Sequence, residues 1–196
     1  MKTELESDFS ICRTVEQSFT DYKKFTTEKR DEIYNPTLKS VLENNDQFVS
    51  VWLSWELSAI DKNYKKEHGR QSVAFFKEKN EIGYSNYLED TAGNPSGLYY
   101  EIKANPSEIL TDPYYYSYSG NKEDEILEAS VCIPMYEKGE FIGLVGADIE
   151  LERFQDILSH FNPFEGSFSV LVSSEGIMFS HSSEEVLNNT VKLNSQ

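Results

Sequence analysis

The stretch from Glu128 to Phe161 constrains the fold most, because its hydrophobic period changes within one short segment. Apolar residues alternate with other residues on both sides of Lys138-Gly139, which is the pattern of two strands joined by a glycine-containing turn. From Leu151 onward, apolar residues recur at helical spacing. The segment therefore predicts an antiparallel hairpin followed directly by an amphipathic helix.

The second strand of this hairpin carries one acidic residue, Asp148, near its end. A strict period of two places Ile142, Leu144 and Gly146 on the same face as Asp148. Because Gly146 has no side chain, we expect space beside the carboxylate. Two roles stay open for Asp148: an anion that faces a ligand cavity, or the N-cap of a helix that starts near Glu150.

Three regions are expected along the chain. Residues 1–46 form an N-terminal helical region, with a long amphipathic helix from Leu5 to Phe25 and a short helix that starts at Asn35-Pro36. Residues 47–162 form a strand-rich module, and residues 163–196 begin a second, incomplete module. The expected fold class is α+β, with the long helix packed on a central antiparallel sheet of about five strands.

The charge, the cysteine spacing and the missing motifs argue against several functions. Lys and Arg number 18 and Asp and Glu number 34, so the net charge of −16 disfavours nucleic-acid binding. Cys12 and Cys132 stand alone, without the spacing of a zinc site, and no cofactor motif or metal site is expected. No nucleophile elbow, phosphate loop or HExxH motif is present, which disfavours an enzyme. No apolar run is long enough to span a bilayer.

Several motifs, taken in order, resemble the double-Cache family of PAS-like extracytoplasmic sensor modules. This family occurs in bacterial chemoreceptors, sensor histidine kinases and cyclic-dinucleotide enzymes. The motifs are Val51-Trp52-Leu53 with Trp55-Glu56, Leu98-Tyr99-Tyr100, Leu110 to Tyr114, Gly139 to Ile149, and Leu171 to Gly176 leading to His181. The resemblance implies a membrane-distal ligand-binding module over 47–162, a membrane-proximal module from 163, and a parent receptor anchored in the membrane.

The resemblance also suggests site residues. Tyr99-Tyr100 stands where the family often has Trp-Tyr, and Asp148 stands where amino-acid-binding members hold the ligand ammonium group. Those members carry an arginine for the ligand carboxylate at the position of Gly97. Without that cation, a buried ligand carboxylate would be unpaired, which is costly. We therefore expect a cationic or amine-containing ligand rather than a simple α-amino acid.

Two aromatic side chains complete the expected site. Trp52 lies in the strand-like segment Gln47 to Leu57 on a face with small serines, so it either lines a cavity or packs in the core. Tyr114 follows the turn Thr111-Asp112-Pro113, and core packing is the alternative for it, as for Tyr99 and Tyr100. The competing functions are a dimerisation or adhesion module built on the N-terminal helix, which also predicts a homodimer, and a carboxylate-based hydrolase.

Overall fold

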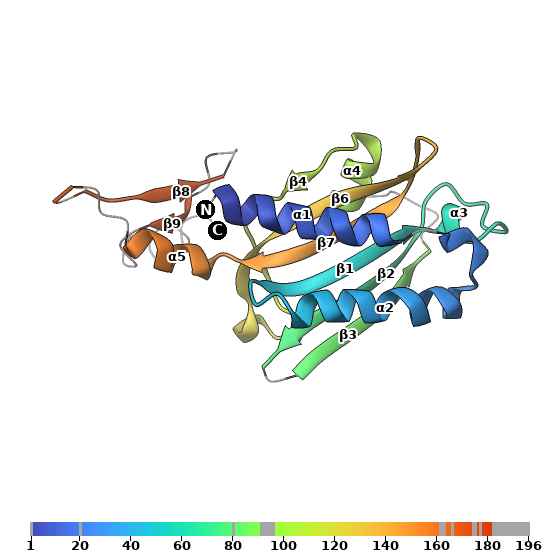
Figure 1. Ribbon diagram of the computed structural model, residues 1–196, viewed down its shortest axis with the longest axis horizontal. Coiled ribbons are helices and arrows are strands. Elements are labelled where there is room, and N and C mark those ends of the chain that lie inside the picture. Colours follow the sequence, from blue (N-terminus) through green and yellow to red (C-terminus); the bar gives the residue numbers. More distant parts are fainter. Residues whose placement is uncertain are drawn as a thin grey trace. The chain divides into compact units, whose positions relative to one another are not determined.

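The structure is a computed structural model that describes residues 2–19, 21–79, 81–90, 97–160, 164–165, 167–173, 176 and 178–181 (Figure 1). Its helices are α1 Lys2–Ser18, η1 Tyr22–Lys24, α2 Thr27–Glu43, α3 Leu57–Ile60, α4 Leu98–Ala104, η2 Lys122–Asp124 and α5 Glu152–Ser159, where η denotes a 3-10 turn. Its strands are β1 Phe48–Glu56, β2 Arg70–Glu78, β3 Glu81–Glu89, β4 Ile109–Leu110, β5 Tyr114–Tyr116, β6 Ile126–Glu137, β7 Glu140–Glu150, β8 Val170–Val172 and β9 Met178–His181.

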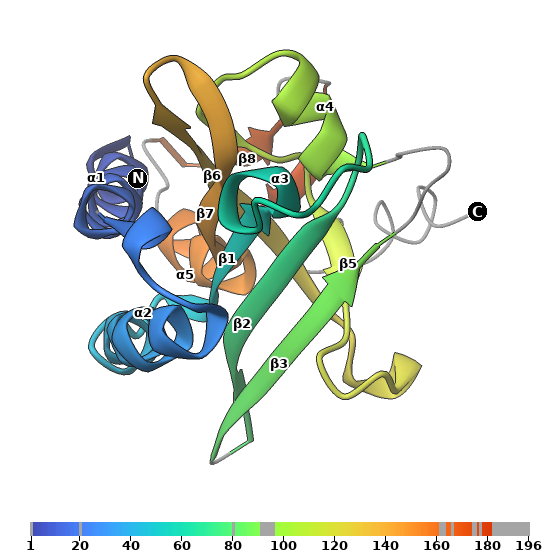
Figure 2. The same ribbon diagram turned by 90° about the vertical axis from the view of Figure 1, so that its right-hand side faces the viewer.

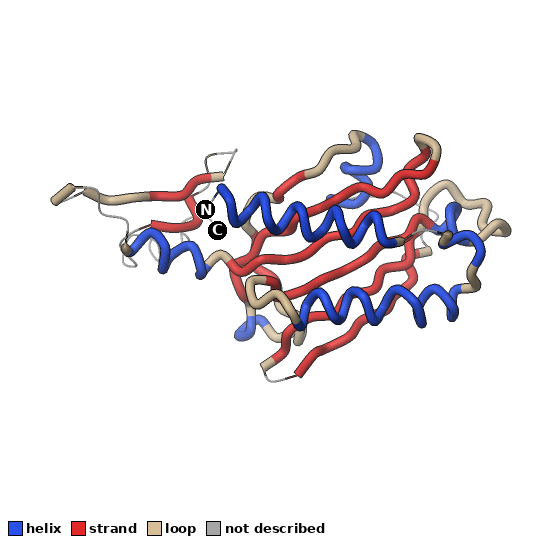
Figure 3. The backbone as a smooth tube through the Cα atoms, viewed as in Figure 1, coloured by secondary structure: helices blue, strands red, loops and turns tan. Residues whose placement is uncertain are grey.

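The main sheet has the strand order β3-β2-β1-β7-β6-β4, and β5 also pairs with β6 (Figure 3). The pairs β1–β2, β2–β3, β4–β6 and β5–β6 are antiparallel. The α+β class with an antiparallel sheet is thus confirmed. The expected number of about five strands was wrong, since the sheet has seven. The mostly exposed edge strand β3 and the very short β4 and β5 lack a strong apolar alternation.

The hairpin β6–β7 is confirmed together with its turn. Lys138 and Gly139 both have positive φ, 53° and 85°, which is the backbone of a tight two-residue hairpin connection. The helix expected after the second strand is α5, which starts at Glu152 with Leu151 as its N-cap residue. Asp148 lies inside β7 and does not cap this helix, so that alternative role was wrong.

Helices cover both faces of the sheet. Figure 2 shows α1 and α2 on one face and α4 on the other. On the α1 side, the ring of Trp55 in β1 stacks on Tyr22 at a centroid distance of 4.9 Å and lies 6.0 Å from Tyr34. Phe19 at the end of α1 lies 4.7 Å from Tyr34. This aromatic cluster joins the two helices to the sheet and confirms the packing expected of the N-terminal helix.

Both expectations about the helix boundaries were wrong. The helix expected from Leu5 to Phe25 ends at Ser18, and Asp21 adopts a left-handed conformation with φ 59° before the short turn η1. The helix expected to start at Asn35-Pro36 starts at Thr27, where the side chain of Thr26 caps it, and it runs through Pro36. Pro36 is exposed, so its ring lies on the solvent side of a helix whose buried face is continuous.

The chain divides into two compact units. One contains residues 2–110 and 130–148, so it includes α1, α2, α4 and most of the sheet. The other contains residues 111–129 and the part of the chain from 149 onward, with the antiparallel hairpin of β8 and β9. The division into modules at 47–162 and 163–196 stays a prediction, and the expected incompleteness towards Gln196 concerns residues 182–196, which lie outside the described residues.

Candidate ligand-binding site

Asp148 is a buried carboxylate held by donors from two other strands. Its side chain is 6% exposed. Its Oδ1 accepts a hydrogen bond from Trp52 Nε1 in β1 at 2.9 Å and one from Ser130 Oγ in β6 at 2.6 Å. Burial, and next the negative charge of Asp148, raise the pKa of the neighbouring Cys132 thiol well above its ordinary value. The carboxylate is therefore a source of negative potential inside the protein, fixed in position by neutral donors.

The space expected beside Asp148 is filled by protein. A Cβ atom on Gly146 would collide with the indole ring of Trp52 and with the carbonyl oxygen of Val131. The absence of a side chain at Gly146 thus admits the ring of Trp52, which then reaches the carboxylate. The expectation of an open space at this position was wrong, because the glycine serves close packing between β1 and β7.

The face expected for Ile142 was also wrong. Leu144 packs in one cluster with Tyr99, and Phe141 packs against the same cluster. Ile142 instead lines a cavity with residues of α1, which is on the other side of the sheet. The alternation breaks at Gly143, where φ is 154° and a Cβ atom would collide with the carbonyl oxygen of Ser54.

The two tyrosines of α4 lie in the cluster that also contains Leu144. Tyr99 and Tyr100 are 3% and 8% exposed, and their rings meet edge to face at a centroid distance of 5.1 Å. Trp52 packs against this cluster and also donates to Asp148. The structure thus brings four of the five expected site residues to one face of one unit. The fifth, Tyr114, is half-buried in β5 of the other unit and pairs with Glu128 of β6.

A row of charged side chains lies beside these tyrosines, and the sequence did not predict it. Glu56, at the end of β1, is 2% exposed, and its Oε2 accepts from Tyr99 Oη at 3.0 Å and pairs with Lys103 Nζ at 3.0 Å. Arg70 lies opposite Glu56 in the β1–β2 register, with its guanidinium 4.9 Å from the centroid of the Tyr99 ring. Its Nε pairs with Glu89 Oε2 at 2.6 Å.

Both tyrosine hydroxyls have raised pKa values, and burial is the largest cause. Burial, followed by the charge of Glu56, raises the pKa of Tyr99, and burial followed by Glu89 raises the pKa of Tyr100. Both hydroxyls therefore act as donors at neutral pH. A sequence signal for the row existed: Glu56 and Arg70 flank the connection between two strands, so antiparallel pairing sets them opposite each other.

Comparison with known proteins identifies the family. A profile described as the methyl-accepting chemotaxis protein-like family, first PDC sensor domain, matches residues 34–156, which is more than half of the chain. The chain belongs to this family. No curated protein sequence matches the chain.

Solved structures share the fold of this PDC sensor domain. The extracellular domain of a protein described as the histidine kinase mmHK1S-Z3 is similar with a TM-score of 0.71 and 23% identity, over 94% of this chain and 66% of that one. The ligand-binding domain of the Campylobacter jejuni chemoreceptor Tlp3, in complex with 4-methylisoleucine, gives 0.65 and 17%, over 95% and 66%. The chain thus spans 66% of the length of either domain.

These comparisons confirm the expected PAS-like, Cache-type sensor domain, and the extracellular origin of the solved neighbours agrees with the expected extracytoplasmic location. None of the helices in the described part of the chain is both long and apolar enough to cross a bilayer. Among the described residues, no three His, Cys, Asp or Glu side chains are grouped closely enough to hold a metal ion.

Proposed function

We propose that this chain is the ligand-sensing domain of a bacterial transmembrane signal transducer, either a methyl-accepting chemotaxis protein or a sensor kinase, and that it acts by binding without catalysis. Membership of the PDC sensor family supports the sensing role. The observation that carries the binding proposal is the buried carboxylate of Asp148, bonded to the same Trp52 that packs against Tyr99 and Tyr100.

The ligand is a small cation or amine. An ammonium group at Asp148 would form a charge-assisted hydrogen bond, which is stronger than the bond that the neutral indole of Trp52 donates. The rings of Trp52, Tyr99 and Tyr100 would provide apolar and cation–π contacts around it. Because Oδ1 already accepts from Trp52 and Ser130, we propose that the ligand ammonium replaces the indole N–H at this oxygen and that Trp52 is the side chain that moves.

Simple α-amino acids are the second ligand class. The solved Tlp3 domains contain 4-methylisoleucine, L-valine or L-norvaline, so this fold accommodates such ligands in that protein. Here Gly97 offers no cation, and Arg70 near Tyr99 already pairs with Glu89. A ligand carboxylate would have to compete with Glu89 for this guanidinium, and that competition weakens its binding.

The parent protein is anchored in the membrane, and the N-terminal helix α1 carries the signal, with a homodimer through this helix as the proposed assembly. Ligand binding shifts the balance between two arrangements of the domain by its differential affinity for them. The sequence also suggested Tyr114 as a ligand contact, and this stays a prediction.

Calorimetry with a panel of primary amines, quaternary amines, amino acids and simple carboxylates tests the proposal. We expect amines to bind, amino acids to bind more weakly, and carboxylates without an amine not to bind. A parallel screen for ester, amide and phosphate hydrolysis should show no turnover. Tight binding of a carboxylate that lacks an amine would overturn the ligand class, and turnover would favour the hydrolase alternative.

A further inference from the structure

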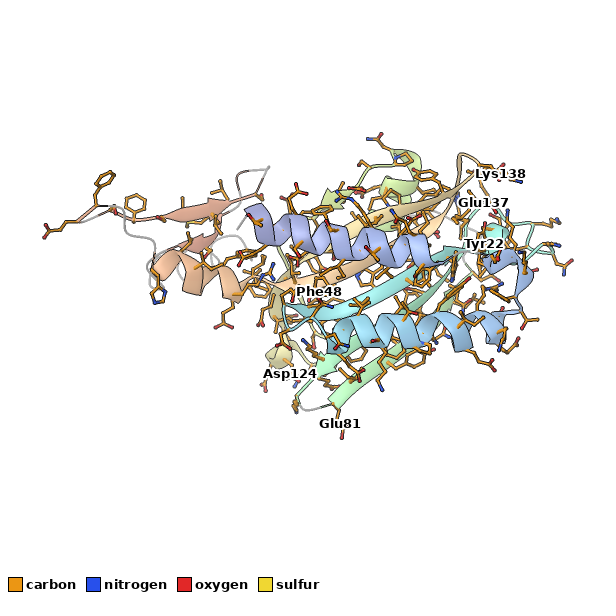
Figure 4. All side chains as sticks on the ribbon, in the orientation of Figure 1. Tyr22, Phe48, Glu81, Asp124, Glu137 and Lys138 are labelled. Carbon is orange, nitrogen blue, oxygen red and sulfur yellow. The ribbon has the colours of Figure 1, made fainter. Side chains whose placement is uncertain are left out.

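A cavity of about 330 Å³ is lined by residues of α1, and Figure 2 shows α1 and α4 on opposite faces of the sheet. The end of α1, the turn η1 and the hairpin β6–β7 line it, and it is partly open to solvent. Its volume is at the lower end of the range for small-molecule sites, roughly 300–1,000 Å³. Figure 4 shows Tyr22 and Glu137, two of its lining residues, at the same end of the sheet.

The walls of the cavity combine carboxylates with aromatic rings. Glu16, Asp21 and Glu137 contribute the carboxylates, and Phe19 and Tyr22 are among the rings. None of the described residues that line the cavity is basic, but Lys23 beside it pairs with Glu137, and its ammonium group lies 5.6 Å from the centroid of the Tyr22 ring. The remaining carboxylates and rings of the wall suit a further cation, through ion pairing and cation–π contacts.

The three carboxylates are not equivalent. Glu137 pairs with Lys23 and accepts a hydrogen bond from Tyr22 Oη at 3.1 Å, and Asp21 pairs with Lys24 Nζ at 2.7 Å. Glu16 forms no ion pair with a residue that the structure describes. Burial raises its pKa, and so does the negative charge of Glu108. Glu16 is thus the carboxylate that gains most from a cation brought in by a ligand.

We propose that this cavity is a second binding site, distinct from Asp148, and that it takes a small organic cation such as a primary amine. A metal ion is the poorer occupant, because no three carboxylate, thiol or imidazole side chains of the described residues converge on one point. The cavity joins the end of α1 to the β6–β7 hairpin. A cation bound there would tie the N-terminal helix to the sheet at a place that the Asp148 site does not touch.

The two tryptophans of the chain report the two sites separately. Trp52 bonds to Asp148 on the α4 side, and Trp55 stacks on Tyr22, which lines the cavity. Fluorotryptophan labelling of the full chain gives two ¹⁹F resonances, and the variants W52F and W55F assign them. Titration with propylammonium chloride then follows each site in one sample.

Four proteins are compared: wild type, E16Q, D148N and the control E6Q, which removes an exposed carboxylate of the same helix outside the cavity. We expect the Trp55 resonance to shift in wild type, E6Q and D148N. In E16Q its midpoint should rise roughly five- to tenfold, the size of one partly buried charge contact. Sodium chloride at equal ionic strength should not shift the Trp55 resonance.

Three results would overturn the second site. The first is a Trp55 resonance that does not shift at saturating amine. If the Trp52 resonance shifts alone, the second site is wrong and the Asp148 proposal stands. The second is an equal midpoint in E16Q and E6Q. The third is a Trp55 shift that follows the Trp52 shift and disappears in D148N, because a single site would then account for both signals.

Discussion

Trp52 Nε1 lies 2.9 Å from Asp148 Oδ1, and this hydrogen bond joins β1 to β7 where Trp52 packs against the residues of α4. The same indole fills the space above Gly146. The bond gives the carboxylate a donor in the absence of ligand, so the buried charge is tolerated. It also places an aromatic ring where a ligand cation would meet it. In the proposed site, the occupied and unoccupied states would therefore differ by an exchange of donors at Oδ1.

Asp148→Asn should weaken amine binding by roughly 2–5 kcal/mol, the range for losing one partner of a buried charge pair. The amide oxygen can still accept from Trp52 and Ser130, so the free energy of unfolding should change by only about 1 kcal/mol. Calorimetry and urea denaturation measure the two effects. Asp46→Asn, at an exposed aspartate, serves as control. Equal amine affinity in D148N and D46N would exclude Asp148 from the site.

Trp52→Phe should strengthen amine binding by a few-fold. The phenyl ring keeps an aromatic wall beside Tyr99, while the competing N–H donor to Asp148 is removed. The unliganded protein should lose about 1 kcal/mol of stability with that hydrogen bond. Trp52→Ala removes the ring as well and should weaken binding and cost about 3–5 kcal/mol of stability. If W52F binds amines as poorly as W52A does, binding needs the indole ring itself, and the exchange of donors at Asp148 is wrong.

Local patterns predicted the elements whose sequence and packing agree. The β6–β7 hairpin and α5 follow from alternation, a Lys138-Gly139 turn and the helical spacing after Leu151, and all three appear in the structure. The strand β3 could not be found in this way, because as an edge strand it has no buried face to impose an alternation. The start of α2 was predicted wrongly at Asn35-Pro36, because packing of the helix on the sheet outweighs the preference of proline for a first helical position.

The side chains of the candidate site were predicted better than their arrangement. Asp148, Trp52 and the two tyrosines do share a face, as their motifs implied. The register of β1 against β7 decides that Trp52 occupies the space above Gly146, and no local sequence pattern encodes this register. The charged row of Glu56, Arg70 and Glu89 likewise needs the pairing of three strands before its members become neighbours.

Glu56→Gln should destabilise the domain by about 3 kcal/mol, near the lower end of the range for breaking a buried ion pair. The substitution keeps an acceptor for Tyr99 but leaves Lys103, whose side chain is 28% exposed, without its counter-charge. Urea denaturation measures the cost. Glu101→Gln, at an exposed position of α4, is the matched control and should change stability by no more than about 0.5 kcal/mol. A loss in E56Q as small as in E101Q would show that the pair contributes little.

The last prediction concerns alkaline pH and Cys12. Burial, followed by the charges of Asp8 and Asp148, raises the pKa of this thiol from 9.0 to about 12. In the unfolded chain the thiol loses its proton near pH 9, whereas in the folded protein it keeps the proton to about pH 12. The unfolded state therefore binds fewer protons above pH 9, and stability should fall as the pH rises through this window.

Cys12→Ala removes this contribution, and the comparison isolates it. The difference in unfolding free energy between wild type and C12A should be constant below pH 9. Above pH 9 it should shift against wild type by up to about 1.4 kcal/mol per pH unit, the value for one proton. Thr14→Ala, on the same helix, changes no titratable group and should follow wild type at every pH. Urea denaturation from pH 7 to 11 measures all three proteins. Burial of Cys12, which is 3% exposed, is the ground for this prediction. Parallel stability curves for wild type and C12A across pH 9 to 11 would contradict it, because the thiol would then ionise as readily in the folded protein as in the unfolded chain.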